Sequence, residues 1–341
     1  MSSIQALLLA TCGLLAQQPE ATTEPFDSPR FGLKVALPGS WKLAVREEED
    51  KVFVALIPQP DPEKPGVALC ELALAPESLD EYRTRIEGGA GRGGKLARNE
   101  VVDTPKGKRL ITVREFRPRE GGLWRELSVR VVAHRQMYTF LLNVDEATYP
   151  AAKLAFEAMV DDAEFKAPDT GAELASKPEN RWLQREFRFT LDLPEGWSPA
   201  LAPSSLALFY ANASAHGIWA DNVLVLAAEP KERDLEALAR DLPAQLRAAE
   251  PDCEVLSCKV IDQPLGKKPV KALETVVRTK RGPFSMTVLE RRFQGERYNY
   301  EVKFTVECSR FDAMATDLRK SLDSFGEAPG EAPVAGTRRA T

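Results

Sequence analysis

Histidine is nearly absent from the sequence, which contains only His134 and His216 in 341 residues. A histidine oriented by a carboxylate is the usual base of nucleophilic catalysis at neutral pH, and zinc sites combine histidine with paired cysteines. Neither histidine has a nucleophile motif around it, and no second cysteine pair accompanies His216. We therefore expect both to be surface or turn residues, and we expect no catalytic, cofactor-binding or metal-binding residues.

No apolar run is long enough to cross a bilayer; the run Ile4–Ala16 instead has the length of a signal-peptide core. No Lys or Arg precedes Arg30, so the positive charge usual before such a core is missing. We expect residues 1–16 to be an export signal and the protein to be periplasmic or extracellular. Because Leu9–Cys12 resembles a lipoprotein box, a lipid anchor at Cys12 on a membrane-anchored lipoprotein is the alternative.

Excess positive charge is also lacking, since 46 basic residues face 51 acidic ones and the net charge is −5. Binding to nucleic acid needs a concentrated basic face, so we expect no nucleic-acid partner. We expect the partner to be another protein. Cysteines outside the signal are Cys70, Cys253, Cys258 and Cys308. Export permits disulfides, and one bridge within the second half is an alternative, although pairing cannot be deduced from sequence. We expect buried free thiols.

An internal repeat is the strongest pattern in the chain. Residues 31–41 (FGLKVALPGSW) and 187–197 (FRFTLDLPEGW) lie 156 residues apart and share period-two apolar positions, a proline and a tryptophan. That period is typical of a strand with one face in the core. The match continues in order with helical positions after Ser78 and Asp234, then Val101–Lys108 with Val260–Lys267, Tyr138 with Tyr298, and Phe165 with Phe325. The slowly drifting spacing indicates duplication with a few loop insertions.

We therefore expect an α+β protein of two tandem copies, each an antiparallel sheet flanked by helices. Residues 26–165 and 183–326 would form the domains, with 166–181 as a polar linker and 327–341 as a disordered tail. In the first copy the pattern predicts strands at 31–37, 52–57, 67–75, 99–103, 110–117, 123–134 and 137–144, and helices at 78–87 and 149–162. A helix at 309–322 closes the second copy.

The F-x-L-x-L-P-x-G-W opening, the middle helix, the meander with an aromatic in its last strand and the closing helix resemble the PsbP-like, DcrB-like and Mog-like group of domains. The resemblance covers both predicted copies and implies an α/β/α sandwich. Families of this fold are mostly non-enzymatic: photosystem subunits, a binding partner of a small GTPase and envelope proteins. It carries over no functional residue, because the shared pattern consists of core and turn positions.

Three polar motifs have a structural explanation. Gly88–Lys95 (GGAGRGGK) matches parts of nucleotide-binding motifs, but a helix precedes it and a strand follows, the reverse of a phosphate-binding turn, so we expect a flexible loop. The acidic run Glu47–Asp50 does not space its oxygens as a calcium loop does and is expected at a hairpin tip. The pattern D-x-P-x-G-K at Asp103–Lys108 and Asp262–Lys267 is expected to form a turn in both copies, with partner binding as the alternative.

These patterns together predict an exported, non-catalytic binding or scaffold protein. Two alternatives stay open. One is a hydrolase-type enzyme with a site in the second copy only, around His216, Asp221, Cys253 or Cys258. The other is a carrier of a small apolar ligand held between sheet and helix.

Overall fold

The computed structural model describes residues 25–48, 51–89, 94–118, 122–175, 180–201, 207–215, 219–232, 234–266, 268–281 and 284–329. The chain separates into two compact units whose main boundary lies between Pro168 and Asp169. Each unit is described by itself. The expected export signal with Cys12, His216 and residues 330–341 of the expected tail lie outside the described residues.

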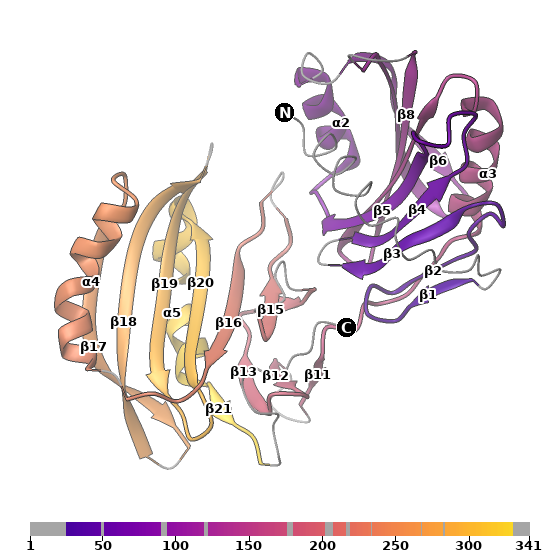
Figure 1. Ribbon diagram of the computed structural model, residues 1–341. Coiled ribbons are helices and arrows are strands. Elements are labelled where there is room, and N and C mark those ends of the chain that lie inside the picture. The colour runs from indigo at the N-terminus through magenta and orange to yellow at the C-terminus, as the bar shows by residue number, and fades with distance from the viewer. Residues whose placement is uncertain are drawn as a thin grey trace. The chain divides into compact units, whose positions relative to one another are not determined.

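The first unit is built on a seven-stranded antiparallel sheet with the order β3-β4-β5-β9-β8-β7-β6 (Figure 1). Its strands are β3 (Lys42–Glu48), β4 (Lys51–Ile57), β5 (Gly66–Leu74), β6 (Lys95–Thr104), β7 (Gly107–Phe116), β8 (Trp124–Ala133) and β9 (Gln136–Asp145). Beside it lies a small sheet of β1 (Phe26–Ser28), β2 (Leu33–Val35) and β10 (Glu164–Phe165). The antiparallel meander expected for the late strands is confirmed.

The second unit has a seven-stranded antiparallel sheet with the order β14-β15-β16-β20-β19-β18-β17. Its strands are β14 (Ser198–Pro199), β15 (Phe209–Asn212), β16 (Asn222–Ala228), β17 (Glu254–Leu265), β18 (Lys268–Arg281), β19 (Phe284–Gln294) and β20 (Asn299–Glu307). A small sheet combines β11 (Ala172–Leu174), β12 (Arg181–Gln184), β13 (Phe189–Asp192) and β21 (Gly326–Glu327). Taken along the chain, the connections within the two large sheets are the same.

Helices cover the sheets. In the first unit α2 (Leu79–Gly88) contacts β6 and β7, and α3 (Tyr149–Asp162) contacts β8 and β9, on the other side of the sheet in Figure 1. In the second, α4 (Leu235–Ala249) contacts β17 and β18, and α5 (Cys308–Asp323) contacts β19 and β20. The side chains of Ser78 and Asp234 cap α2 and α4 by accepting hydrogen bonds from Glu81 and Ala237 N–H, the role expected of these residue types. The predicted α+β class is confirmed.

The core of the second unit lies between the large sheet, α5 and β13. It contains Trp197, Phe293, Tyr300, Phe304 and Phe325, each at most 7% exposed. Burying rings of this size removes a large apolar area from water, which is the main stabilising contribution for such a layer. The buried aromatic rings therefore fix the position of β19 and β20, the two strands that carry much of the candidate site.

Candidate binding pocket in the second unit

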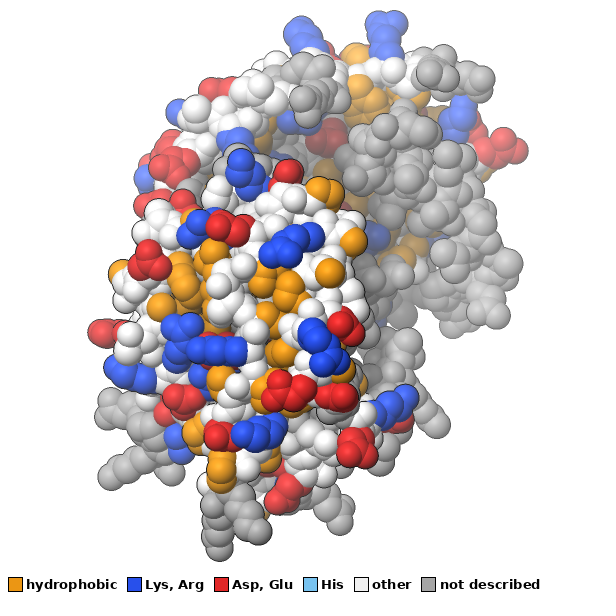
Figure 2. Space-filling view, turned by 90° about the vertical axis from the view of Figure 1, so that its left-hand side faces the viewer, with side chains coloured by type: hydrophobic (Ala, Val, Ile, Leu, Met, Phe, Trp, Pro, Cys, Tyr) orange, Lys and Arg blue, Asp and Glu red, His pale blue; other side chains and the backbone are white. Residues whose placement is uncertain are grey.

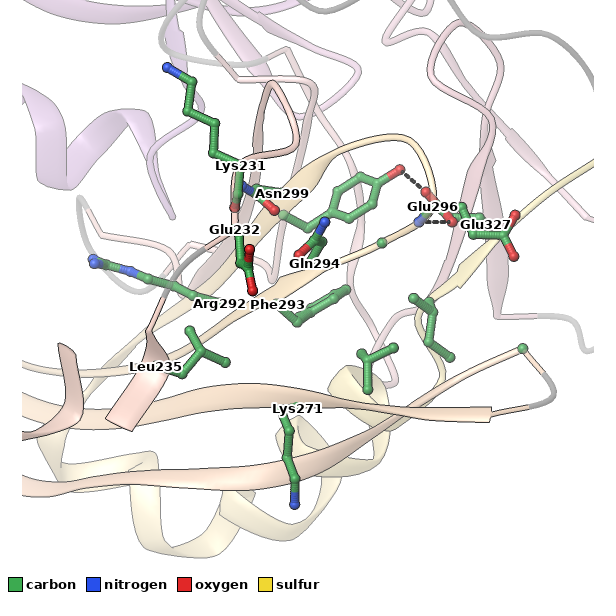
Figure 3. Close-up of a pocket in the computed structure, with 15 residues that line it drawn as sticks. Lys231, Glu232, Leu235, Lys271, Arg292, Phe293, Gln294, Glu296, Asn299 and Glu327 are labelled. Atoms are coloured by element: carbon green, nitrogen blue, oxygen red, sulfur yellow. Dashed lines mark hydrogen bonds between the residues drawn. The ribbon is translucent and has the colours of Figure 1, made fainter. Parts of the chain in front are cut away.

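A pocket of about 1000 Å³ opens at one end of the second unit's large sheet (Figure 3). Four segments line it: the loop into α4, the β17–β18 hairpin, the β19–β20 hairpin and β21. The lining residues used below are Lys231, Glu232, Leu235, Leu265, Val270, Lys271, Arg292, Phe293, Glu296, Asn299, Tyr300 and Glu327. A concavity of this volume has the size of a ligand site.

The β17–β18 hairpin forms one wall because it reaches past its neighbour. The last pair between β18 and β19 is Ala272↔Phe293, so Lys268–Lys271 extends beyond it. In the first unit only Gly107 and Lys108 of β7 extend beyond the last pair with β8. The longer hairpin leaves a hollow beside the end of β19.

This hairpin also corrects one expectation. In the first unit D-x-P-x-G-K does form the turn, with Thr104 pairing Gly107 across Pro105 and Lys106. In the second, Asp262–Leu265 belongs to β17 and pairs with β18, and the turn comes later, at Gly266 with φ 60°. Asp262↔Lys271 and Gln263↔Val270 match the last two pairs of the first hairpin, Asp103↔Lys108 and Thr104↔Gly107. Two extra pairs, Pro264↔Pro269 and Leu265↔Lys268, follow them and move the turn along the chain.

The pocket's apolar surface comes from three elements. Leu235 begins α4, Leu265 ends β17 and Val270 lies in β18, and all three side chains are half-buried. Phe293 and Tyr300 are 3% and 2% exposed and close the inner side, where their rings pack 5.7 Å apart. Half-exposed aliphatic side chains next to a rigid aromatic wall can accept an apolar group, which removes their remaining surface from water.

Glu327 forms the polar end of the pocket. One carboxylate oxygen accepts hydrogen bonds from the Tyr300 hydroxyl at 2.9 Å and from Arg297 N–H at 3.1 Å, and the other accepts from Glu296 N–H at 2.8 Å. Figure 3 shows Glu296 beside Glu327, with the hydrogen bonds drawn as dashed lines. Burial raises the pKa of Tyr300, and the neighbouring Glu327 charge raises it further, so the hydroxyl remains a donor at neutral pH.

The remaining charged lining groups divide into paired and solvated ones. Arg292 pairs with Glu290 and Glu301, and Lys271 pairs with Asp262 at 2.8 Å and points away from the cavity in Figure 3. Burial would lower the pKa of Arg292, but the two carboxylates raise it, so this guanidinium stays charged. Lys231, Glu232 and Glu296 are exposed at the rim.

Asn299 fixes the loop that precedes α4. Its side-chain amide donates to the backbone oxygens of Lys231, at 2.9 Å, and Glu229, at 3.3 Å, while the residue itself is only 6% exposed. These bonds attach the loop to β20 and hold the Lys231–Glu232 wall in place. The pocket is therefore built on rigid elements on three sides.

The chemistry of this lining favours binding. No histidine, cysteine or serine is among the residues that line the pocket. Among the residues that the structure describes, no group of three His, Cys, Asp or Glu could hold a metal ion. An apolar floor with a few placed polar groups is the usual composition of a binding site.

Of the residues of the enzyme alternative, the structure describes Asp221, Cys253 and Cys258, and it keeps Asp221 and Cys258 apart. Asp221 precedes β16 and Cys258 lies in β17, with β20, β19 and β18 between them in the sheet. Asp221 is fully buried and has a structural role: it pairs with Arg310 at 2.7 Å and accepts Glu307 N–H at 3.0 Å, beside the start of α5. Cys253 lies between α4 and β17.

The other sequence candidates are at structural positions. His134 is an exposed turn residue with φ 48° between β8 and β9, as expected. Gly88 ends α2 and Gly94 precedes β6, so a helix does precede the glycine-rich segment, whose residues 90–93 lie outside the described ones. β3 and β4 pair as far as Glu48↔Lys51, the hairpin expected for the acidic run, with residues 49–50 not described.

All four cysteines in the described part of the chain are free thiols; Cys70 and Cys253 are buried as expected, whereas Cys258 and Cys308 are only partly buried. Burial raises the pKa of Cys70 well above its usual value, with the Glu71 charge adding to the effect. Such a thiol is protonated and unreactive at neutral pH.

Sequence reasoning missed the pocket, and an arginine at matching positions in the two units does not by itself locate it. Arg130 in β8 and Arg292 in β19 each lie four residues before the first turn residue of their hairpin, His134 and Glu296. Arg130 lies beneath α2, 5.5 Å from the ring of Tyr82, whereas Arg292 borders the pocket. This shared arginine is a polar position common to both repeats.

No protein-family model and no curated protein matches this sequence. Among solved structures, the chain is similar to the PsbP protein CyanoP of Synechocystis sp. PCC 6803, with 10% identity over 46% of this chain and 97% of that one and a TM-score of 0.34. It is also similar to LpqN of Mycobacterium tuberculosis, involved in cell envelope biogenesis, with 11% identity over 41% of this chain and 83% of that one and a TM-score of 0.33. A third similar structure is the immunity protein TplEi of Pseudomonas aeruginosa, with 12% identity over 86% of this chain and 98% of that one and a TM-score of 0.26.

With TM-scores of 0.26 to 0.34, these similarities assign neither a family nor a function to this chain. None of the described helices is both long and apolar enough to cross a membrane.

Proposed function

We propose that this protein is a non-catalytic binding protein and that the pocket of its second unit receives an apolar side chain of a partner protein. The single observation that supports this best is the pocket itself. Leu235, Leu265 and Val270 are half-buried around a cavity of about 1000 Å³ whose rim carries charges of both signs. A buried apolar centre within a polar rim is the arrangement found at protein interfaces.

The surroundings of the pocket favour a protein over a small apolar ligand. The side of the second unit shown in Figure 2 mixes basic, acidic and apolar side chains without an extended area of one charge. Lys231, Glu232 and Glu296 at the rim are exposed and available to pair with groups outside the pocket. A purely apolar carrier site would leave these charges without a role.

We further propose that the units are duplicated copies of one PsbP-like α/β/α sandwich, with domains at 26–165 and 183–326 and an export signal at 1–16. The equal strand order of the two large sheets supports duplication. Within the expected linker, Ala172–Leu174 forms β11 and pairs with β12, so part of this segment is ordered on the second unit. Export places the binding partner in the periplasm or outside the cell, with anchoring through Cys12 as the alternative.

A photo-crosslinking experiment tests the binding proposal. A benzophenone amino acid replaces Leu265 in the pocket or, as the control, Leu154 on α3, which is 69% exposed. Irradiation in the cells that produce the protein should give a discrete protein adduct from position 265 and none from position 154. A lipid or other small-molecule adduct at 265, or the same adducts from both positions, would overturn the proposal.

A further inference from the structure

The inner end of the pocket is a preformed site for a carboxylate. Three donors converge there, the Tyr300 hydroxyl and the consecutive backbone N–H groups of Glu296 and Arg297, and together they bind both oxygens of Glu327 at 2.8 to 3.1 Å. Successive N–H groups in a turn form a concave anion-binding arrangement, and hydrogen bonds to a charged acceptor are stronger than neutral ones. We call these three donors the carboxylate nest.

The group in the nest is supplied by the chain itself. Glu327 lies on β21, which pairs with β13 through only Phe189↔Glu327 and Thr190↔Gly326. We call Gly326–Pro329 the strap. The side chain of Glu327 therefore occupies the nest as an internal ligand, in the same pocket as the half-buried Leu265 and Val270.

The strap has other anchors that do not involve the Glu327 side chain. Arg297 donates to Ala328 O at 2.7 Å, and Arg188 donates to Pro329 O at 2.7 Å. Ala328 N–H also donates to Arg188 O at 2.7 Å. Removing the Glu327 carboxylate would therefore empty the nest while these bonds keep the strap on the unit.

The first unit does not use its equivalent tyrosine in this way. There the Tyr138 hydroxyl donates to the backbone oxygen of Phe31 at 2.6 Å, in the buried part of the unit. The hydroxyl of the equivalent tyrosine thus binds a backbone oxygen in the first unit and a carboxylate in the second. The nest is a feature of the second unit, where the pocket lies.

We propose that the nest recognises a carboxylate carried next to an apolar group on the partner, and that Glu327 competes with it as a built-in substitute. This inference rests on the proposed function and specifies its partner: the apolar group contacts Leu265 and Val270, and the carboxylate displaces Glu327 from Tyr300. A tethered competitor acts at an effective concentration on the order of millimolar. The wild-type protein therefore binds such a partner more weakly than a protein without this carboxylate.

Isothermal titration of the full chain tests this with three probes: acetyl-dileucine with a free carboxylate, its C-terminal amide, and the amide of acetyl-leucyl-glutamate. Glu327→Ala should bind one of the two carboxylate probes, the free acid or the glutamate amide, at least tenfold more tightly than wild type does, and should not bind the dileucine amide. Binding of the glutamate probe in place of the free acid assigns the carboxylate to an acidic side chain, and the reverse assigns it to a chain end. Either result supports the nest.

Two further variants separate recognition from folding. Adding Tyr300→Phe to Glu327→Ala should abolish the gained binding, whereas adding Tyr138→Phe, the matched change in the first unit, should leave it unchanged. Glu327→Gln keeps the shape of the side chain without its charge and should give an affinity between those of wild type and Glu327→Ala. Thermal unfolding of each variant confirms that the second unit is folded.

Three results would overturn the inference: binding of the dileucine amide as tight as that of both carboxylate probes, equal affinity of wild type and Glu327→Ala for these two probes, or no effect of Tyr300→Phe on the gained binding. Equal binding of acid and amide together with crosslinking at position 265 would leave the pocket as a protein-binding site without carboxylate recognition. If no probe binds and position 265 gives no protein adduct, the proposed function fails as well.

Discussion

Tyr138 and Tyr300 occupy equivalent positions in the two units. Each ring lies 4.8 Å from the phenylalanine that follows the last helix, Phe165 or Phe325, with interplanar angles of 58° and 59°. Spacing in the sequence had paired Tyr138 with Tyr298, and the structure corrects this. The pair Ala133↔Gln136 closes the first hairpin, and the bond from Gly295 N–H to Tyr298 O closes the second in the same way. Gln136 therefore corresponds to Tyr298. Two residues after each of these lie Tyr138 and Tyr300.

The two tyrosine hydroxyls should differ in their contribution to stability. Tyr138→Phe leaves the buried Phe31 oxygen without its donor and should lower the free energy of unfolding of the first unit by about 1 to 2 kcal/mol. Tyr300→Phe removes one of three donors to Glu327 and should cost the second unit less. Urea unfolding monitored by hydrogen exchange in each unit measures both values. Equal losses would contradict the difference described here.

Glu126 should make the first unit less stable as pH rises. Burial raises the pKa of Glu126, and this outweighs Arg114 and Arg130, which lower it. A carboxyl whose pKa is higher in the folded than in the unfolded state contributes stability below its unfolded pKa, and this is lost as pH rises through the folded value. Glu126→Gln should therefore raise the melting temperature at pH 7 and change it little below pH 4. An unchanged melting temperature at pH 7 would show that the effect of burial on the pKa of Glu126 does not outweigh that of Arg114 and Arg130.

Asp221 should be required for stability of the second unit and not for binding. Asp221→Asn removes the charge that Arg310 and Glu307 N–H contact and leaves Arg310 without its buried partner. Breaking a buried ion pair from one side costs about 3 kcal/mol. Chemical denaturation measures the loss, and Asp312→Asn, at an exposed position on the same helix, serves as the control. A stable variant without any change in denaturation midpoint would refute the structural role.

Two glycines near the pocket should respond differently to alanine. A Cβ at Gly295 would lie 2.7 Å from the ring of Tyr300 and 2.8 Å from a Glu327 oxygen. Gly295→Ala should therefore cost about 2 to 3 kcal/mol and weaken binding in the pocket. Gly266 has φ 60° and no atom within 4 Å of such a Cβ, so Gly266→Ala should cost only the backbone strain, about 1 kcal/mol. Thermal unfolding of the pair gives the order of the two effects.

Elements with strong local signals could be predicted from the sequence. The helix expected at 149–162 has these bounds, and the helical positions expected after Ser78 and Asp234 do lie in helices, which begin at Leu79 and Leu235. The strand Lys42–Glu48 was missed. It is an edge strand containing only three apolar residues among charged ones, so its alternation is weak, and its pairing with β4 depends on partners elsewhere in the chain.

The pocket could not be predicted, because its lining comes from four separate segments. Its wall depends on how far β18 extends beyond β19, and this is a matter of strand register. The aligned D-x-P-x-G-K motifs suggested equal hairpins, whereas extra cross-strand pairs place the second turn at Gly266. The single glutamate Glu327 was assigned to a tail, and only the tertiary structure shows what it binds.

The extended β17–β18 hairpin has a consequence for how this protein can change over evolution. The tip of the hairpin reaches the core only through the partly buried Leu265 and Val270, and lengthening a surface connection costs little in chain entropy, about 0.6 kcal/mol per doubling. Changes at the exposed tip positions, such as Gly266 and Pro269, can therefore reshape the cavity while Leu265 and Val270 keep their contact with the core. The second unit can thus vary at its rim, whereas the shorter hairpin of the first unit has no such extension.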